Sequence, residues 1–219
     1  MYYVLFTGSG RESNTANYIR QHLSSEHCTG CFYPQRHMKK KIRGTWTDYY
    51  ERLIPGYLFV ESDDIDALYQ ELRRHPLLLH VLGRYEQEDT DTLVTFLPLD
   101  EKEELWLRRI SGLPPKRKPV QSPGETAGGS ERTDTGRNPG LYGGISSQNM
   151  SGLPVVELSE VGFDENDEVV ILSGPLMNLK GQVKKIDLHR RIAKVEVSFM
   201  GAQTILHLGI DLVERAGAE

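Results

Sequence analysis

Apolar and polar residues alternate along the last quarter of the chain, in short runs separated by glycine, proline and aspartate. From Val195 to Phe199 every second residue is apolar, which is the period that a half-buried strand requires. Gly174-Pro175 interrupts one run, and the polar segment Asp187 to Arg191 predicts a hairpin tip. Gly181 is expected to adopt a backbone conformation that a residue with a Cβ would resist. The pattern predicts about five short strands that close a barrel too small to hold a catalytic cleft.

The first hundred residues predict an α+β domain. Runs with the composition of strands occupy residues 2–7, 31–36 and 56–60, and residues 46–50 predict a further short strand. The run at 56–60 is apolar enough to lie centrally in a sheet that is covered on both faces.

Helical spacing of apolar residues appears in three segments of this domain. A helix is expected from Glu12 and a second over residues 65–72, preceded by Asp63 and Asp64. Asp100 and Glu103 predict a capping box for a third helix. The apolar positions of the first and third helices are Ala16, Ile19, Leu23, Trp106, Ile110 and Leu113.

Residues Pro114 to Gly152 are rich in proline, glycine, serine, threonine and charge, with almost no large apolar side chains. Such a segment cannot bury enough apolar surface to offset the entropy lost on ordering, so we expect a flexible tether. We predict domains at residues 1–113 and 161–219, joined by a flexible linker at 114–160. A tether of this length lets each domain bind its own target.

The chain of 219 residues carries a formal net charge of −5, with a pI near 5.8. That balance excludes the global basicity of a histone-like or ribosomal protein, so any contact with nucleic acid must come from a local patch. No run approaches the roughly 20 apolar residues that span a bilayer, and the sequence predicts a cytoplasmic protein.

Cys28 and Cys31 are the only cysteines, and their spacing raises the alternatives of a zinc site or a redox pair. A zinc site needs four ligands, and His22, His27 and His37 lack the usual spacing. A thioredoxin-like pair begins a helix after a strand, whereas this pair follows a predicted helix and leads into a strand. We therefore expect two reduced, packed thiols and no metal.

The sharpest chemical feature of the first domain is a basic run from Arg36 to Arg43. No carboxylate occurs between Cys31 and Thr47, although the protein as a whole is acidic. Cations that pair with phosphates release counterions, so such a patch can hold a nucleic-acid backbone in a salt-dependent way. A solvated hairpin tip is the alternative. The exclusion of acids favours nucleic acid, and the RNA-binding candidates are Arg36, His37, Lys39, Lys40, Lys41 and Arg43.

Motifs for enzymatic chemistry are incomplete. Gly8-Ser-Gly10 lacks the third glycine and acidic partner of a dinucleotide site, and Gly174 to Lys180 lacks the ending of a phosphate-binding loop. The sequence predicts no enzyme, no catalytic residue and no cofactor.

The C-terminal residues resemble the KOW domain of the NusG transcription factors, an SH3-like barrel. In that family the barrel binds the termination factor Rho or an S10-type ribosomal protein, partly through a loop that often reads Phe-Gly-Arg. The loop here reads Met200-Gly201-Ala202, and loss of the arginine implies weak or no contact with Rho. The resemblance makes Phe199, Met200, Gly201 and Thr204 the partner-binding candidates. The matching positions are Phe163, Asp167, Val169, Gly174-Pro175, Gly181, Val183, Asp187, Val195, Val197 and Asp211 to Val213.

The first domain resembles the NGN domain of the same family, an antiparallel sheet with flanking helices. There an apolar depression packs against the clamp helices of the β′ subunit of RNA polymerase, which implies Leu53, Ile54 and Tyr57 as the polymerase-binding residues here. The family often has Phe at the position of Ile54, and core packing is the alternative role of Tyr57. The matching positions are Tyr3-Val4, Gly8 to Glu12, Pro34, the basic stretch up to Gly44, Pro55 to Val60, Leu82-Gly83 and Pro98-Leu99.

Within the family the chain resembles the LoaP antiterminators, through Cys31 to Pro34, Lys39 to Lys41 and His75 to Gly83. LoaP-like proteins are associated with recognition of an RNA hairpin through the first domain. The resemblance implies a monomeric bacterial elongation factor that binds RNA polymerase and a nascent RNA hairpin and promotes processive antitermination of particular operons. The alternatives are a housekeeping member that recruits Rho or the ribosome, and a translation-associated KOW protein that binds RNA without polymerase contact.

Overall fold

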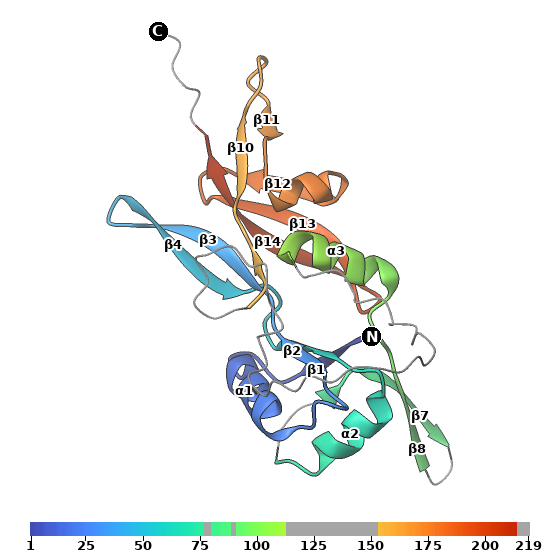
Figure 1. Ribbon diagram of the computed structural model, residues 1–219. Helices are drawn as coiled ribbons and strands as arrows, with labels where there is room; N and C mark the ends of the chain where they lie inside the picture. Colours follow the sequence, from blue (N-terminus) through green and yellow to red (C-terminus); the bar gives the residue numbers. More distant parts are fainter. Residues whose placement is uncertain (77–79, 89–90, 113–152, 214–219) are drawn as a thin grey trace, which may run out of the picture.

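The computed structural model describes residues 1–76, 80–88, 91–112 and 153–213 (Figure 1). Leu113 and residues Pro114 to Gly152 of the expected linker 114–160 lie outside the described residues. The first domain contains, in order, β1 (Tyr2–Phe6), α1 (Glu12–His22), β2 (Gly30–Phe32), β3 (Gln35–Ile42), β4 (Thr45–Arg52), β5 (Tyr57–Glu61), α2 (Ile65–Arg73), β6 (His80–Val81), β7 (Gly83–Glu88), β8 (Asp91–Phe96) and α3 (Glu101–Ser111). The second part contains β9 (Val155–Val156), β10 (Ser159–Phe163), β11 (Val169–Ile171), the 3-10 helix η1 (Pro175–Gln182), β12 (Val183–Asp187), β13 (Ile192–Phe199) and β14 (Ala202–Leu212).

The central sheet of the first domain has the strand order β2-β5-β1-β6, so the apolar strand β5 lies in its interior as predicted. Side chains alternate between its two faces. Leu5 and Leu58 point into the cluster that α1 and α2 cover. Val4 and Phe59, which are directly paired, point into a second cluster that contains Leu107 of α3 and several barrel residues. The second face of the sheet is therefore covered partly by the other domain.

The predicted capping box at the start of α3 is confirmed. Asp100 Oδ1 accepts a hydrogen bond of 2.7 Å from the Glu103 N–H, and Glu103 Oε2 accepts one of 3.2 Å from the Asp100 N–H. At the start of α2, the Asp64 side chain accepts a hydrogen bond from the Ala67 N–H. Both helices begin where the sequence placed them, because a local side chain satisfies their free N–H groups.

The basic run forms most of one strand and begins the turn that follows it, so its outer cations lie at the tip of a hairpin. The single strand expected over residues 31–36 is divided: β2 ends at Phe32, and β3 begins at Gln35 after Pro34, whose nitrogen has no hydrogen to donate. β3 pairs with β4 along eight residues, and the connecting residues Arg43 and Gly44 have φ of +50° and +88°. Positive φ at both positions is the geometry of a two-residue hairpin whose twist matches the strands.

The C-terminal part is the predicted small barrel, with strand order β11-β10-β14-β13-β12. Val195, Val197 and Phe199 point inward, as their alternation predicts. Gly174 has φ of +88°, and a Cβ there would lie 2.7 Å from the Leu158 carbonyl oxygen, so glycine is required. The expectation for Gly181 is wrong: it has no positive φ, and a Cβ there would meet nothing within 4 Å.

A short strand ties the barrel to the first domain. β9 and the start of β10 lie within residues 114–160, the segment that the sequence assigned to the linker. β9 pairs in parallel with β3, with Val155 opposite Gln35 and Val156 opposite Arg36. Leu153, just before it, is buried in the cluster that also holds Leu58. The barrel therefore lies against the β3–β4 hairpin and α3 (Figure 1).

Candidate functional site

The turn from Ile54 to Tyr57 is held by a buried carboxylate. Glu12, the first residue of α1, is 0% exposed, and its Oε1 accepts a hydrogen bond of 2.6 Å from the Gly56 N–H. Its other carboxylate oxygen lies 3.1 Å from Arg52 Nε. The Gly56 carbonyl accepts a hydrogen bond of 2.8 Å from the Thr7 N–H, and Gly56 has φ of +90°. Residues of the β1–α1 junction therefore set the shape of this turn.

The environment of Glu12 keeps its side chain charged. Burial raises the pKa of the carboxyl, but hydrogen bonds from the backbone N–H groups of Gly56, Glu12 and Gly10, together with the charge of Arg52, outweigh that effect. The resulting pKa lies below the ordinary value of 4.5. The carboxylate is therefore ionised at neutral pH, where it accepts these hydrogen bonds most strongly.

The residues implied as polymerase-binding belong to one apolar cluster that also contains barrel residues. Leu53 and Ile54 are 1% and 6% exposed and belong to the same apolar cluster as Phe199 of the barrel. Tyr57 is half-buried, with ring centroids of Phe6 and Phe199 each 5.4 Å from its own. Tyr57 therefore packs across the domain boundary as well as within its own domain.

The partner-binding candidates of the barrel contact the same surface. Phe199 ends β13, and Met200 and Gly201 form the following turn with φ of +52° and +75°. The Gly201 N–H donates a hydrogen bond of 3.3 Å to Glu103 Oε1 of α3. Thr204 lies apart from the turn, half-buried on β14. The two surfaces for which the sequence implied separate partners thus face one another in this structure.

Two residues of α3 complete this contact and were not among the sequence candidates. Trp106 is 8% exposed, and its Nε1–H donates a hydrogen bond of 3.1 Å to the Ser198 carbonyl oxygen. Glu103 contributes its Oε1 to the barrel while its Oε2 completes the helix cap. Helical spacing places Trp106 on the apolar side of α3, but no local signal indicates that the covering surface belongs to the other domain.

Two cations of the basic run have carboxylate partners distant in sequence. Arg36 Nη2 lies 2.7 Å from Glu51 on β4, and Lys39 Nζ lies 2.5 Å from Asp211 Oδ2 of the barrel. The Arg36 Nη1–H also donates a hydrogen bond of 2.7 Å to the His207 carbonyl oxygen. The absence of acids within the run itself therefore does not leave these two cations unpaired.

His37 lies between two acids, at 3.1 Å from Asp48 and 3.0 Å from Glu157, and stacks on Tyr50. The remaining cations of the run, Lys40, Lys41 and Arg43, are exposed, and none has a carboxylate partner within the described part of the chain. Lys40 Nζ lies 5.2 Å from the centre of the Tyr49 ring. The outer part of the hairpin therefore carries the unpaired charge.

The two cysteines are free thiols, and Cys31 is buried. Burial raises the pKa of Cys28 to about 11; the hydrogen bond to the Gly30 backbone and the charge of Arg20 oppose this rise, and the charges of Glu71 and Glu61 add to it. Burial, followed by the neighbouring Cys28, raises the pKa of Cys31 further. Neither thiol is an activated nucleophile at neutral pH.

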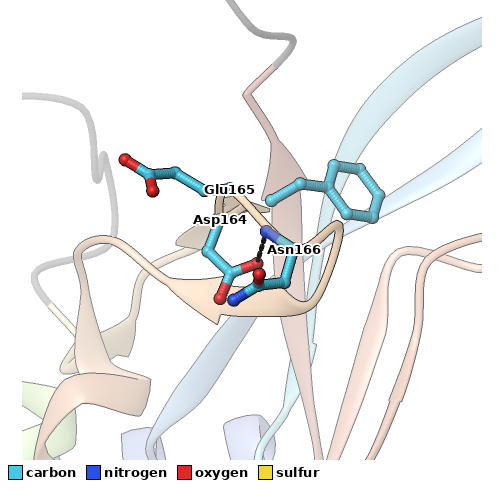
Figure 2. A pocket seen from close by; sticks show the side chains of 4 residues that line it. Asp164, Glu165 and Asn166 are labelled. Atoms are coloured by element: carbon cyan, nitrogen blue, oxygen red, sulfur yellow. Dashed lines mark hydrogen bonds between the residues drawn. The ribbon is translucent and has the colours of Figure 1, made fainter.

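A pocket at one end of the barrel is lined by Phe163, Asp164, Glu165 and Asn166 (Figure 2). Asp164 Oδ1 accepts hydrogen bonds of 2.9 Å from the Asn166 and Glu168 N–H groups, so this carboxylate shapes the loop between β10 and β11. Glu165 points away from Asp164 and Asn166 in Figure 2. The arrangement is that of a capped turn, and we assign it no catalytic role.

No group of three or more His, Cys, Asp or Glu residues in the described ranges could hold a metal ion. No helix of those ranges is long and apolar enough to cross a bilayer.

The chain is similar to two family models and to solved structures. Residues 1–109 match the family model NusG, described as transcription termination factor nusG, and residues 165–198 match the KOW motif. Together the two matches cover well over half of the chain. The solved structure "Domain interaction in Thermotoga maritima NusG" aligns with 95% of this chain and 92% of that chain, at 18% identity and a TM-score of 0.37. At that TM-score this structural similarity adds nothing to the two family matches.

Proposed function

Given that this chain belongs to the NusG family of transcription factors, we propose that it is a specialised elongation factor that binds RNA polymerase and a nascent RNA hairpin. Leu53, Ile54 and Tyr57 are the proposed contacts with the clamp helices of the β′ subunit, and the β3–β4 hairpin is the proposed contact with RNA. The protein then promotes processive antitermination of particular operons. It acts by occupying the transcribing complex and carries out no chemistry itself.

The proposed polymerase contact is supported by an apolar face of the first domain on which residues of the barrel pack. Phe199 of the barrel packs on Tyr57 of the first domain, and Leu53 and Ile54 lie in the same cluster. Such a face stays apolar when the barrel moves away, and the buried Glu12 keeps its turn in shape. Tyrosine at the centre of an apolar patch is a frequent hot spot in interfaces, because it buries a large area with few rotatable bonds.

Polymerase and the barrel then compete for Tyr57. Because the two rings pack on each other, Phe199 must leave Tyr57 before either residue can meet an external partner. The apparent affinity for polymerase is the intrinsic affinity reduced by the fraction of molecules in which this contact is open. The contacts of Trp106 and Glu103 with the barrel set that fraction.

The RNA contact is supported by the cations that are left without carboxylate partners in the described residues, Lys40, Lys41 and Arg43. They occupy the outer end of β3 and the turn that follows it, in a protein of net charge −5. Exposed cations that repel one another are destabilising by themselves, and phosphates relieve that repulsion.

Replacing Lys40 and Lys41 with glutamine is expected to lower affinity for an RNA hairpin about tenfold at low salt. Each phosphate contact contributes about 0.9 to the slope of log K against log salt, so the slope should fall by about 1.8. Lys39 is kept, because its removal would also break the ion pair with Asp211. A gel shift across a salt series measures both quantities. Replacing the exposed Lys102 and Lys180 with glutamine makes the same charge change elsewhere. If both double variants bind equally well, the hairpin is not the RNA contact.

The function itself is tested by transcription in vitro through a terminator placed after a hairpin-encoding leader, with and without Rho. We expect the protein to raise read-through in both cases, because the barrel loop lacks the arginine that the family uses. Increased termination that depends on Rho would instead identify the housekeeping alternative. No effect on the polymerase, together with retained RNA affinity, would identify the translation-associated alternative.

A further inference from the structure

The basic strand β3 lies directly on the barrel strand β14. A Cβ added to Gly209 of β14 would lie 2.2 Å from the His37 carbonyl oxygen of β3, so glycine is needed for the two backbones to approach. The Arg36 guanidinium donates to the His207 carbonyl oxygen at 2.7 Å, and Met38 is 1% exposed. The hairpin and the barrel therefore form one continuous surface at this seam.

A row of basic side chains crosses the barrel up to that seam. Lys185 of β12 pairs in register with Lys194 of β13, which pairs with His207 of β14. Ala193 and Leu208, the neighbours of Lys194 and His207 along their strands, are buried. Because side chains alternate between the faces of a strand, Lys194 and His207 lie on the outer face of the barrel.

The hydrogen bond from Arg36 to the His207 carbonyl oxygen places this row beside the first cation of β3. Burial lowers the pKa of His207, and the charges of Arg36 and Lys194 lower it further, opposed by Glu51. His207 therefore senses a cation from each domain. Lys40 lies four residues beyond Arg36 on β3 and thus on the same face of the strand.

The carboxylates close to the row are already engaged. Glu51 pairs with Arg36 at 2.7 Å, and Glu196 pairs with Lys184 at 2.7 Å. Within the described ranges, the exposed Lys185 and Lys194 have no carboxylate partner of their own. Side chains of like charge that lie opposite each other repel and destabilise the fold. An anionic ligand bound between them removes that repulsion.

We propose that the RNA-binding surface is shared by the two domains, as a strip in which Lys185, Lys194 and His207 of the barrel continue the basic face of β3. The strip takes the sugar–phosphate backbone of an RNA helix. It crosses the barrel strands β12, β13 and β14, about 10 Å at the usual strand spacing, and continues onto β3, which packs on β14 from a separate sheet. That length suits several consecutive phosphates. The inference rests on the proposed RNA binding by the hairpin and adds the barrel to it. It concerns the β3–β14 seam, which is separate from the contact between Phe199 and Tyr57.

The first test replaces Lys185 and Lys194 with glutamine in the full chain. The probe is a pool of RNA hairpins with a randomised stem of about ten base pairs, because backbone contacts do not depend on sequence. The affinity is expected to fall about tenfold at low salt, and the salt slope by about 1.8. The Lys102 and Lys180 double variant is the matched control. An affinity equal to that of this control overturns the proposal.

The second test separates the two halves of the strip without removing a charge. Gly209→Ala places a methyl group against the backbone oxygen of His37, which cannot turn aside, so β3 must move away from β14. RNA affinity should fall about tenfold, whereas Gly181→Ala, where a Cβ meets nothing within 4 Å, should leave it unchanged. Unchanged affinity in Gly209→Ala overturns the shared surface. If Lys40→Gln with Lys41→Gln still weakens binding, the proposed function survives that result.

Discussion

Replacing Ile54 and Tyr57 with alanine is expected to lower the affinity for RNA polymerase about a hundredfold. A hundredfold loss corresponds to about 2.7 kcal/mol, or about 1.4 kcal/mol for each truncated residue, which is more than the roughly 1 kcal/mol that most interface residues cost. Binding can be measured by co-migration with elongation complexes under gentle ionic conditions. RNA binding by the hairpin cations Lys40 and Lys41 should be retained, because neither truncated side chain belongs to the β3–β4 hairpin, and this retention shows that the first domain is still folded.

A second variant is expected to raise the affinity for RNA polymerase instead of lowering it. Trp106→Ala removes the hydrogen bond to the Ser198 carbonyl and the packing of α3 on the barrel, but leaves Ile54 and Tyr57 in place. It should release the barrel and raise the apparent affinity for polymerase, about tenfold if the closed form predominates. Leu105→Ala, at a neighbouring position that is 47% exposed, is the control for truncation on α3.

The two variants together separate the roles of Tyr57. If Tyr57 only packs against Phe199, its truncation frees the barrel and polymerase binding rises, as it does in Trp106→Ala. A rise in the Ile54 and Tyr57 double variant would therefore contradict the polymerase contact and leave core packing as the role of Tyr57.

Glu12→Gln is expected to lower the free energy of unfolding at pH 7 by about 2 to 3 kcal/mol. Glutamine keeps the shape of the side chain but loses the charge-assisted hydrogen bond to Gly56 and the ion pair with Arg52. The estimate lies below that for a fully buried pair, because the Arg52 side chain is 37% exposed and can turn to water. Urea unfolding followed by tryptophan fluorescence measures it, since Trp46 and Trp106 both belong to the first domain.

The difference in free energy of unfolding between wild type and Glu12→Gln is expected to depend on pH. The folded-state pKa of Glu12 lies below the ordinary value of 4.5, so its stabilising effect is complete above that pH and is lost as the pH falls through the folded-state pKa. The gap between wild type and Glu12→Gln should therefore close in acid. Glu101→Gln, an exposed glutamate in the first turn of α3, controls for the helix dipole. A gap that persists unchanged in acid would mean that the ionised carboxylate does not hold the turn.

Local elements of this protein are readable from short stretches of sequence. Asp100 and Glu103 cap α3 because both partners lie within a single turn of chain, and β5 lies inside the sheet because every residue from Leu58 to Val60 is apolar. The prediction for Gly181 failed because glycine permits an unusual conformation without requiring one. The strand expected over residues 31–36 runs through Pro34, but proline has no N–H to donate to a ladder, and the chain divides there into β2 and β3.

The candidate surfaces were readable only in part. The basic run stood out by composition, but the carboxylate that pairs with Lys39 is 172 residues away, and so no window of sequence contains both. In the sequence, Glu12 is only the first residue of an expected helix. In the structure its carboxylate accepts a hydrogen bond from the Gly56 N–H, 44 residues further on. The Pro-Gly-Tyr turn marks Tyr57 in the sequence. The ring that packs on it, Phe199, belongs to the other domain, and no local pattern indicates this contact.

Sequence alone was sufficient for the α+β first domain, the small barrel, the capping box of α3 and the concentration of cations between Arg36 and Arg43. These features follow from interactions between neighbouring residues, whose spacing is written directly in the chain. The pairing of Arg36, His37 and Lys39 with acids, the covering of Tyr57 by Phe199, and the meeting of β3 with β14 came only from the tertiary structure. Such contacts depend on how two folded surfaces fit together, and that fit is a property of the assembled chain.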